Sequence, residues 1–193
     1  FMPEDYILLV TNNTQKVNQL KKKLTSHGYQ VVAVANDAYS GLRILRSQKV
    51  ALSIIDYELP GLNGLQLARI MDNEKLGPLI LISNYQIDFR GNLPLSIFGV
   101  LINPITEYQL INTIKLAISQ YNIQKKLEKE LDDLREQLEA RKKVEKAKGI
   151  IMQKYKVTED AAYKIIRQIS MEKRKPMKKI AEAIILKEEG NKK

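Results

Sequence analysis

Residues 51–64 read Ala-Leu-Ser-Ile-Ile-Asp-Tyr-Glu-Leu-Pro-Gly-Leu-Asn-Gly, and this stretch decides the fold of the first half of the chain. Residues 51–55 are a short, nearly unbroken apolar run, which is typical of a strand buried on both faces of a parallel sheet. The run ends at an acid, Asp56, and Pro60-Gly61 then turns the chain into the next helix. The stretch therefore predicts a strand, an acidic loop and a helix in succession.

The alternation of strand and helix continues on both sides of this stretch. Thr14 is expected to cap the first helix. Residues 84–94 lack a helical apolar stripe, so the helix expected there is predicted to be short or absent. The pattern predicts an α/β, doubly wound, five-stranded parallel sheet, with ligand sites at the carboxyl ends of its strands. The further strands are predicted at residues 7–10, 29–34, 79–82 and 97–102.

The residues from Asp56 to Gly64 resemble the phosphoacceptor segment of two-component receiver domains. Ser83 matches the switch hydroxyl of that family, and Asn103-Pro104 matches its Lys-Pro pair with the lysine replaced. The resemblance implies a receiver-like (flavodoxin-like) α/β domain over residues 5–120. It also implies a cis Asn103–Pro104 peptide bond, because the corresponding receiver bond is usually cis.

The receiver positions that assist phosphorylation are changed in this chain. Receivers carry two acids after the first strand to hold Mg²⁺, whereas this chain has Thr11 and Asn12. Neutral side chains attract a hard divalent cation weakly, and Asn103 removes the lysine that neutralises phosphoryl oxygens. Asp56 is either an active phosphoacceptor or a vestigial acid, and we favour the vestigial role for Asp56 and Ser83. We therefore expect a pseudo-receiver that uses no cofactor and no Mg²⁺ and is controlled by protein contact or another ligand.

A single long helix is predicted between the two halves of the chain. Thr106 and Gln109 have the spacing of a capping box, and no proline or glycine follows until Gly149. The helix is therefore expected to reach about Tyr155. Residues 121–140 are predicted to be either a solvated linker or, as we favour, the coiled coil of a parallel homodimer. The dimerisation seam consists of leucines spaced as in a heptad, namely Leu127, Leu131, Leu134 and Leu138.

Positive charge is concentrated at the end of the chain. Residues 141–193 carry 17 Lys and Arg against 7 Asp and Glu, which accounts for the whole formal net charge of +10. Such a basic end is either a set of solvated helix faces or a surface for a phosphate backbone. Residues 141–188 also divide into three amphipathic segments, with Thr158 as a cap and Pro176 in the first turn of the third helix.

The sequence of residues 125–186 resembles the ANTAR domain of transcription antitermination regulators of the amidase and nitrate regulator type. Val-Glu-Lys-Ala-Lys-Gly-Ile-Ile-Met at 144–152 and Thr-Glu-Asp-Ala-Ala-Tyr at 158–163 are the main matches. Ser170 departs from the alanine that is usual in the family. The resemblance implies a three-helix head, including the end of the coiled coil, that binds paired hairpins in nascent mRNA and prevents terminator formation. The candidate RNA contacts are Lys146, Lys148, Gln153, Arg167, Arg174 and Lys175.

Two other functions stay open at this point. A DNA-binding response regulator would place the second and third helices of the head as a helix-turn-helix, and an interaction adaptor would have no nucleic-acid role. The chain has no cysteine, one histidine and no apolar run long enough for a membrane span, so we expect neither an enzyme nor a membrane protein. We expect a cytoplasmic protein whose partners are mRNA, a second copy and a sensor or kinase protein.

Overall fold

The computed structural model describes residues 5–89 and 91–190, and the chain divides into two compact units between Lys125 and Lys126. The first unit contains a sheet in which all neighbouring strands are parallel, in the order β2-β1-β3-β4-β5. This confirms the predicted receiver-like sheet. The strands are β1 (Tyr6–Val10), β2 (Gln30–Ala35), β3 (Leu52–Asp56), β4 (Leu79–Ser83) and β5 (Ile97–Ile102).

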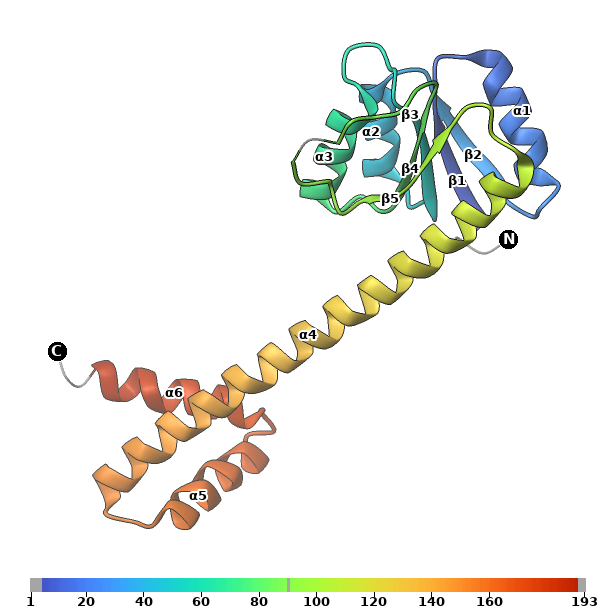
Figure 1. The fold of residues 1–193 in the computed structure, drawn as a ribbon. Coiled ribbons are helices and arrows are strands. Elements are labelled where there is room, and N and C mark those ends of the chain that lie inside the picture. Colours follow the sequence, from blue (N-terminus) through green and yellow to red (C-terminus); the bar gives the residue numbers. More distant parts are fainter. Residues whose placement is uncertain (1–4, 90, 191–193) are drawn as a thin grey trace. The chain divides into compact units, whose positions relative to one another are not determined.

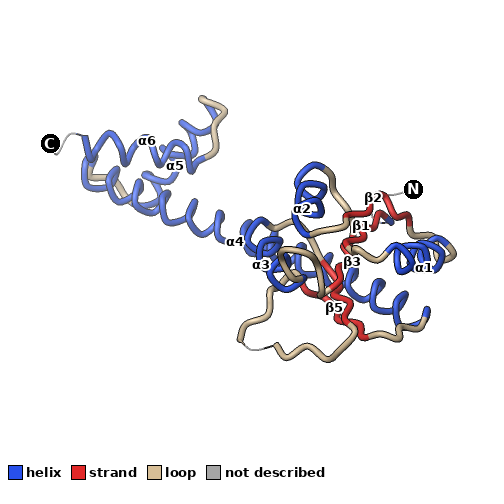
Figure 2. Tube along the Cα trace, turned by 90° about the horizontal axis from the view of Figure 1, so that it is seen from above, coloured by secondary structure: helices blue, strands red, loops and turns tan. Residues whose placement is uncertain are grey.

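Helices cover both faces of the sheet (Figures 1 and 2). α1 (Thr14–Thr25) and the start of α4 (Glu107–Tyr155) pack on one face, and their buried side chains include Leu20 and Ile114. α2 (Ala38–Ser47) and α3 (Gly64–Glu74) pack on the other face. β3 and β4 are buried along their whole length, as central strands between two helix layers must be.

Two details of the first unit differ from or complete the sequence prediction. Asn13, and not Thr14, caps α1, because its side-chain oxygen accepts from the Lys16 backbone nitrogen. Among the described residues no helix lies between β4 and β5, as predicted. Ile87 and Phe89 of that connection instead pack against the face that holds α2 and α3, so the apolar surface is covered without a helix.

α4 begins and ends where the sequence predicted. Thr106 Oγ1 accepts from the Gln109 backbone nitrogen at 3.2 Å, and Gln109 Oε1 accepts from the Thr106 nitrogen at 3.0 Å. This reciprocal pair satisfies donors that the first turn of a helix leaves free. The helix continues through Gly149 without a break to Tyr155.

The second unit is a small helical bundle. The end of α4 packs with α5 (Glu159–Glu172) and α6 (Met177–Gly190) around buried Ala147, Ile166 and Ala181. Thr158 caps α5, as predicted, whereas Pro176 precedes α6 rather than lying in its first turn. Pro176 still starts the helix, because its carbonyl accepts from Lys179 and Ile180. No helix in residues 5–89 and 91–190 is long and apolar enough to cross a membrane.

Candidate functional site

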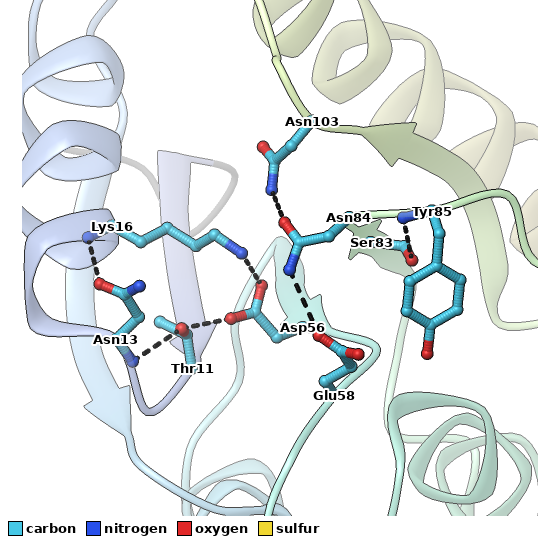
Figure 3. A network of polar contacts seen from close by, with 9 residues as sticks. All are labelled: Thr11, Asn13, Lys16, Asp56, Glu58, Ser83, Asn84, Tyr85 and Asn103. Atoms are coloured by element: carbon cyan, nitrogen blue, oxygen red, sulfur yellow. Dashed lines mark hydrogen bonds and ion pairs between the residues drawn. The ribbon is translucent and has the colours of Figure 1, made fainter.

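The carboxyl ends of four strands surround a polar pocket of about 660 Å³. Asn12 follows β1, Asp56 ends β3, Asn84 follows β4 and Asn103 follows β5, and all four line the pocket. Figure 3 shows their side chains directed toward a common centre, except for Asn12, which it does not draw. The sequence therefore predicted correctly that Asp56 and Asn103 would lie at one edge of the sheet.

Both carboxylate oxygens of Asp56 already have hydrogen-bond donors. Thr11 donates from Oγ1 to Oδ2, and Lys16 of α1 places Nζ 2.6 Å from Oδ1 (Figure 3). The side chain of Asp56 is 9% exposed and that of Lys16 is 18% exposed, so this ion pair is largely shielded from water. Lys16 was not predicted as a site residue, because nothing local in the chain indicates which acid a lysine in the first turn of α1 will contact.

The residues around Asp56 do not fit the divalent cation that the receiver fold implies. Mg²⁺ requires several oxygen ligands in octahedral geometry, and carboxylates supply most of the attraction. Here Thr11 uses its hydroxyl to donate to Asp56, and an ammonium group already neutralises that carboxylate. In the described ranges no group of three or more His, Cys, Asp or Glu side chains is arranged to hold a metal. A second cation would be repelled by Lys16.

Asn103 takes part in a separate chain of hydrogen bonds, whereas the Ser83 hydroxyl is bonded within its own loop. Asn103 Nδ2 donates to Asn84 Oδ1 at 2.7 Å, and Asn84 Nδ2 donates to Glu58 at 3.2 Å (Figure 3). Ser83 is 2% exposed, and its hydroxyl accepts from the Tyr85 backbone nitrogen at 3.2 Å. The Asn103–Pro104 peptide bond is cis, as predicted. These contacts connect β4 and β5 to the loop after β3 without using a cation.

The loop after Asp56 requires glycine at the start of α3. A Cβ on Gly64 would lie 2.7 Å from the carbonyl oxygen of Asp56 and 2.9 Å from Leu81 Cδ2. Atoms cannot approach so closely, so only glycine allows α3 to begin directly against the end of β3. The backbone nitrogen of Gly64 also donates to the Tyr57 carbonyl at 2.8 Å. The glycine that ends the receiver-like segment from Asp56 to Gly64 is therefore required for steric reasons.

Many of the cations in the second unit form ion pairs within that unit. Lys146 Nζ lies 2.8 Å from Glu189, and Lys143 Nζ lies 2.6 Å from Glu182, so both join α4 to α6. Pairs of this kind at the surface contribute little to stability, but they partly neutralise the cations involved. Lys146, a predicted RNA contact, is therefore less available to a phosphate than its exposure alone suggests.

Lys148 lies inside the unit. It is 7% exposed, and its Nζ lies 2.8 Å from Glu145 and 2.6 Å from Glu159. These two carboxylates raise the pKa of Lys148, and Lys148 in turn lowers the pKa of Glu159. The arrangement argues against the predicted RNA contact at Lys148, because an RNA phosphate would have to displace two carboxylates from a nearly buried side chain. Lys148 instead fixes the end of α4 against the start of α5.

Four other cations form an exposed, unpaired set near the end of α5. Within the described residues none of their side chains forms an ion pair or a hydrogen bond. The carbonyl end of a helix favours positive charge, which stabilises Lys173, Arg174 and Lys175 just beyond α5 without a carboxylate partner. The backbone of Arg174 is left-handed, with φ of 51°. We call this set the free cation cluster, and it consists of Arg167, Lys173, Arg174 and Lys175.

Two other predicted features are exposed. Gln153 is exposed on α4, and in the described parts of the chain its side chain has no hydrogen-bond partner. The leucines of the predicted seam lie between 48% and 59% exposed in the single chain. Apolar side chains repeated along one face of a polar helix leave a surface that a partner helix can cover. That surface is formed by Leu127, Leu131, Leu134 and Leu138.

Comparison with known families and proteins gives matches to both units. Residues 7–115 match the family described as response regulator receiver domain, and residues 132–185 match the ANTAR domain. The chain is 30% identical over 168 residues to the transcriptional regulatory protein PdtaR of Mycobacterium tuberculosis, covering 86% of this chain and 82% of that protein. It is 28% identical over 157 residues to the transcriptional regulatory protein MalR of Bacillus subtilis, covering 74% of this chain and 65% of MalR.

Solved structures resemble the first unit in fold. The N-terminal domain of a response regulator/sensory box/GGDEF protein from Carboxydothermus hydrogenoformans aligns with a TM-score of 0.56 at 20% identity, covering 62% of this chain and 98% of that structure. A CheY-like receiver domain protein from Methanospirillum hungatei aligns with a TM-score of 0.54 at 21% identity, with the same coverage. At these identities the likeness shows a shared fold.

Proposed function

This chain belongs to the response regulators in which a receiver domain is followed by an ANTAR domain, and from this premise we propose that it is an RNA-binding transcription antiterminator. It binds paired hairpins in a nascent mRNA leader in the cytoplasm and thereby prevents terminator formation. Residues 5–120 receive the signal, residues 121–140 form a coiled coil, and residues 125–186 bind RNA.

The free cation cluster is the observation that carries this proposal. An RNA hairpin presents phosphates on its stem and unstacked bases in its loop, and proteins bind it with cations and apolar or aromatic surfaces. Arg167, Arg174 and Lys175 are exposed and have no carboxylate partner in the described residues. When unpaired cations neutralise phosphates, they release the counterions condensed on the RNA, and no internal ion pair of the protein is lost. Lys146 and Gln153 on α4 remain candidates for further contacts.

We further propose that the receiver domain transmits its signal without phosphorylation of Asp56. The ion pair with Lys16 and the hydrogen bond from Thr11 occupy both carboxylate oxygens, and Ser83 is bonded to its own loop. A sensor protein that binds at this edge of the sheet is then the natural source of control. The domain requires no cofactor under this proposal.

RNA binding is tested by a competition experiment with the full chain. The probe is a labelled leader RNA from a gene next to the protein's own, with two short hairpins of which the second overlaps a terminator. We expect excess unlabelled hairpin RNA to displace the probe and duplex DNA of the same length to displace it poorly. The logarithm of the affinity should fall linearly with the logarithm of the salt concentration, because several phosphates are neutralised.

The competition also separates the other two functions. Preferential displacement by duplex DNA would identify a DNA-binding response regulator and would contradict antitermination. Hairpin binding that is weak and almost independent of salt would favour an interaction adaptor, since a phosphate interface must release counterions.

The seam of leucines is proposed to join two chains, so that one dimer presents two heads to two hairpins. Tethering then raises the effective concentration for the second contact. We expect Leu131→Glu with Leu134→Glu to convert a dimer to a monomer at tens of micromolar in equilibrium sedimentation. The matched control is Lys126→Gln with Lys129→Gln, which changes the net charge equally on another face of the helix. A wild-type chain that is already monomeric at this concentration contradicts the proposal.

A further inference from the structure

An apolar groove lies between the end of α4, α5 and α6. Its volume is about 430 Å³, within the range of roughly 300–1,000 Å³ found for small-ligand sites. Buried Ile151 and Ile180 close the bottom of the groove. The bundle therefore leaves an indentation over its core that its own side chains do not fill. The walls are formed mainly by Ile150, Ile165, Ile169, Ala183 and Ile184.

The rim of this groove is cationic. Lys173 of α5 and Lys187 of α6 line it, and neither has a carboxylate partner in the part of the chain that the structure describes. Lys154 lies 3.5 Å from Glu188, the one acid of the lining, so that acid is already neutralised. Tyr155 stands at the edge with 63% of its surface exposed. An apolar floor is thus combined with unpaired ammonium groups and an aromatic ring.

These properties suit a nucleobase that carries its phosphate. We propose that the groove receives one unstacked base of the hairpin loop, while Lys173 and Lys187 hold the phosphates on either side of it. A flat base gains stacking and apolar contact in such a groove, and loops expose bases that are free to enter. Lys173 also belongs to the free cation cluster, so the groove adjoins the proposed RNA surface. This inference rests on the proposed function.

A second copy of the chain fits the groove less well than a nucleotide. The lysines on the rim would repel another basic helical unit, because residues 141–193 carry a net charge of +10 in each copy. An RNA loop supplies the flat apolar face of a base, which matches the apolar floor of the groove. It also supplies negative phosphates, which match the lysines on the rim. Charge complementarity therefore favours the nucleotide.

Filling the groove tests the inference in the full chain. Hairpins carry 2-aminopurine at one loop position at a time, and we expect wild-type protein to change the fluorescence strongly at one position. Ala183→Phe should abolish that change and lower the hairpin affinity at least about fivefold, because stacking of one base is lost. Leu186→Phe is the matched control, since Leu186 is exposed on the same helix but outside the groove lining. Thermal unfolding by circular dichroism checks that both variants fold.

Hairpins with one abasic loop position give a second test, in which the RNA is changed as well as the protein. Wild-type affinity should fall at the position that 2-aminopurine identified, whereas Ala183→Phe should lose no further affinity there. Should the variant misfold, Lys173→Gln with Lys187→Gln takes its place, and Lys164→Gln with Lys179→Gln, whose lysines have acidic partners, is the control.

The outcomes distinguish this inference from the proposed function. If neither an abasic position nor Ala183→Phe changes the hairpin affinity, the groove does not bind a base, and the proposed antitermination function is unaffected. A wild-type chain that binds no hairpin overturns both. A loss of affinity confined to one loop position and to the groove variants supports the inference.

Discussion

Replacing Arg167 and Arg174 by glutamate is expected to lower the affinity for RNA hairpins by about a hundredfold or more, because each lost hydrogen bond to a charged phosphate is worth about 1.5–3 kcal/mol. Both arginines are exposed, and within the described residues neither side chain forms an ion pair or a hydrogen bond. The bundle should therefore stay folded, with only a small decrease in its thermal unfolding temperature, because a glutamate at position 174 places negative charge at the carbonyl end of α5. Fluorescence anisotropy with a labelled two-hairpin RNA measures the change.

The dependence on salt gives an independent readout of the same variant. Removing a phosphate contact should reduce the slope of log affinity against log salt by about one per contact. The matched control is Lys164→Glu with Lys179→Glu, which changes the net charge equally at lysines that already pair with Asp160 and Glu182. An equal loss in the control would mean that general charge, and not the free cation cluster, sets the affinity.

The wild-type receiver domain is expected to show no response to Mg²⁺ with beryllofluoride or to acetyl phosphate. Amide NMR signals around Asp56 and Ser83 should stay in place, because Lys16 already neutralises Asp56 and repels a second cation. Saturable shifts at these amides in the wild-type chain would contradict the pseudo-receiver.

A triple variant should restore the missing metal site. Thr11→Asp and Asn12→Asp supply two carboxylates beside Asp56, and Lys16→Gln removes the competing ammonium group. Three carboxylates are the ligand set that a hard divalent cation prefers, so saturable shifts with Mg²⁺ are expected in this variant. Lys16→Gln alone is the matched control and should not bind Mg²⁺, because it adds no carboxylate to Asp56 and Glu58, and Glu58 already accepts a hydrogen bond from Asn84. Failure of the triple variant to bind Mg²⁺ would mean that Thr11, Asn12 and Lys16 are not the only residues that prevent metal binding.

The match between prediction and structure differs between local and distant features. The capping pair Thr106 and Gln109 and the cap Thr158 were correctly predicted, because a cap depends on residues within three positions of each other. The incorrect prediction of Thr14 as a cap is wrong by only one residue. The neighbouring Asn13 is an equally good capping residue and caps the helix instead.

The polar site was predicted only in part. Asp56, Ser83 and Asn103 follow buried strands, and the ends of parallel strands meet at one edge, so their proximity follows from the order of elements. Lys16 and Asp56 are 40 positions apart, and no periodicity in the chain pairs them. The same limit applies to Lys148, whose contact with Glu159 depends on the angle at which α5 returns along α4.

The sequence by itself determined the parallel sheet, the uninterrupted helix, the neutral residues at the metal positions and the basic end of the chain. These features depend on residue type and short-range spacing, which can be read directly from the chain. Only the tertiary structure decided that Lys16 neutralises Asp56, which cations are left without partners, and that a groove opens beside Lys173. The physical reason is that ion pairing and packing depend on distances between side chains far apart in sequence, and folding alone brings those side chains together.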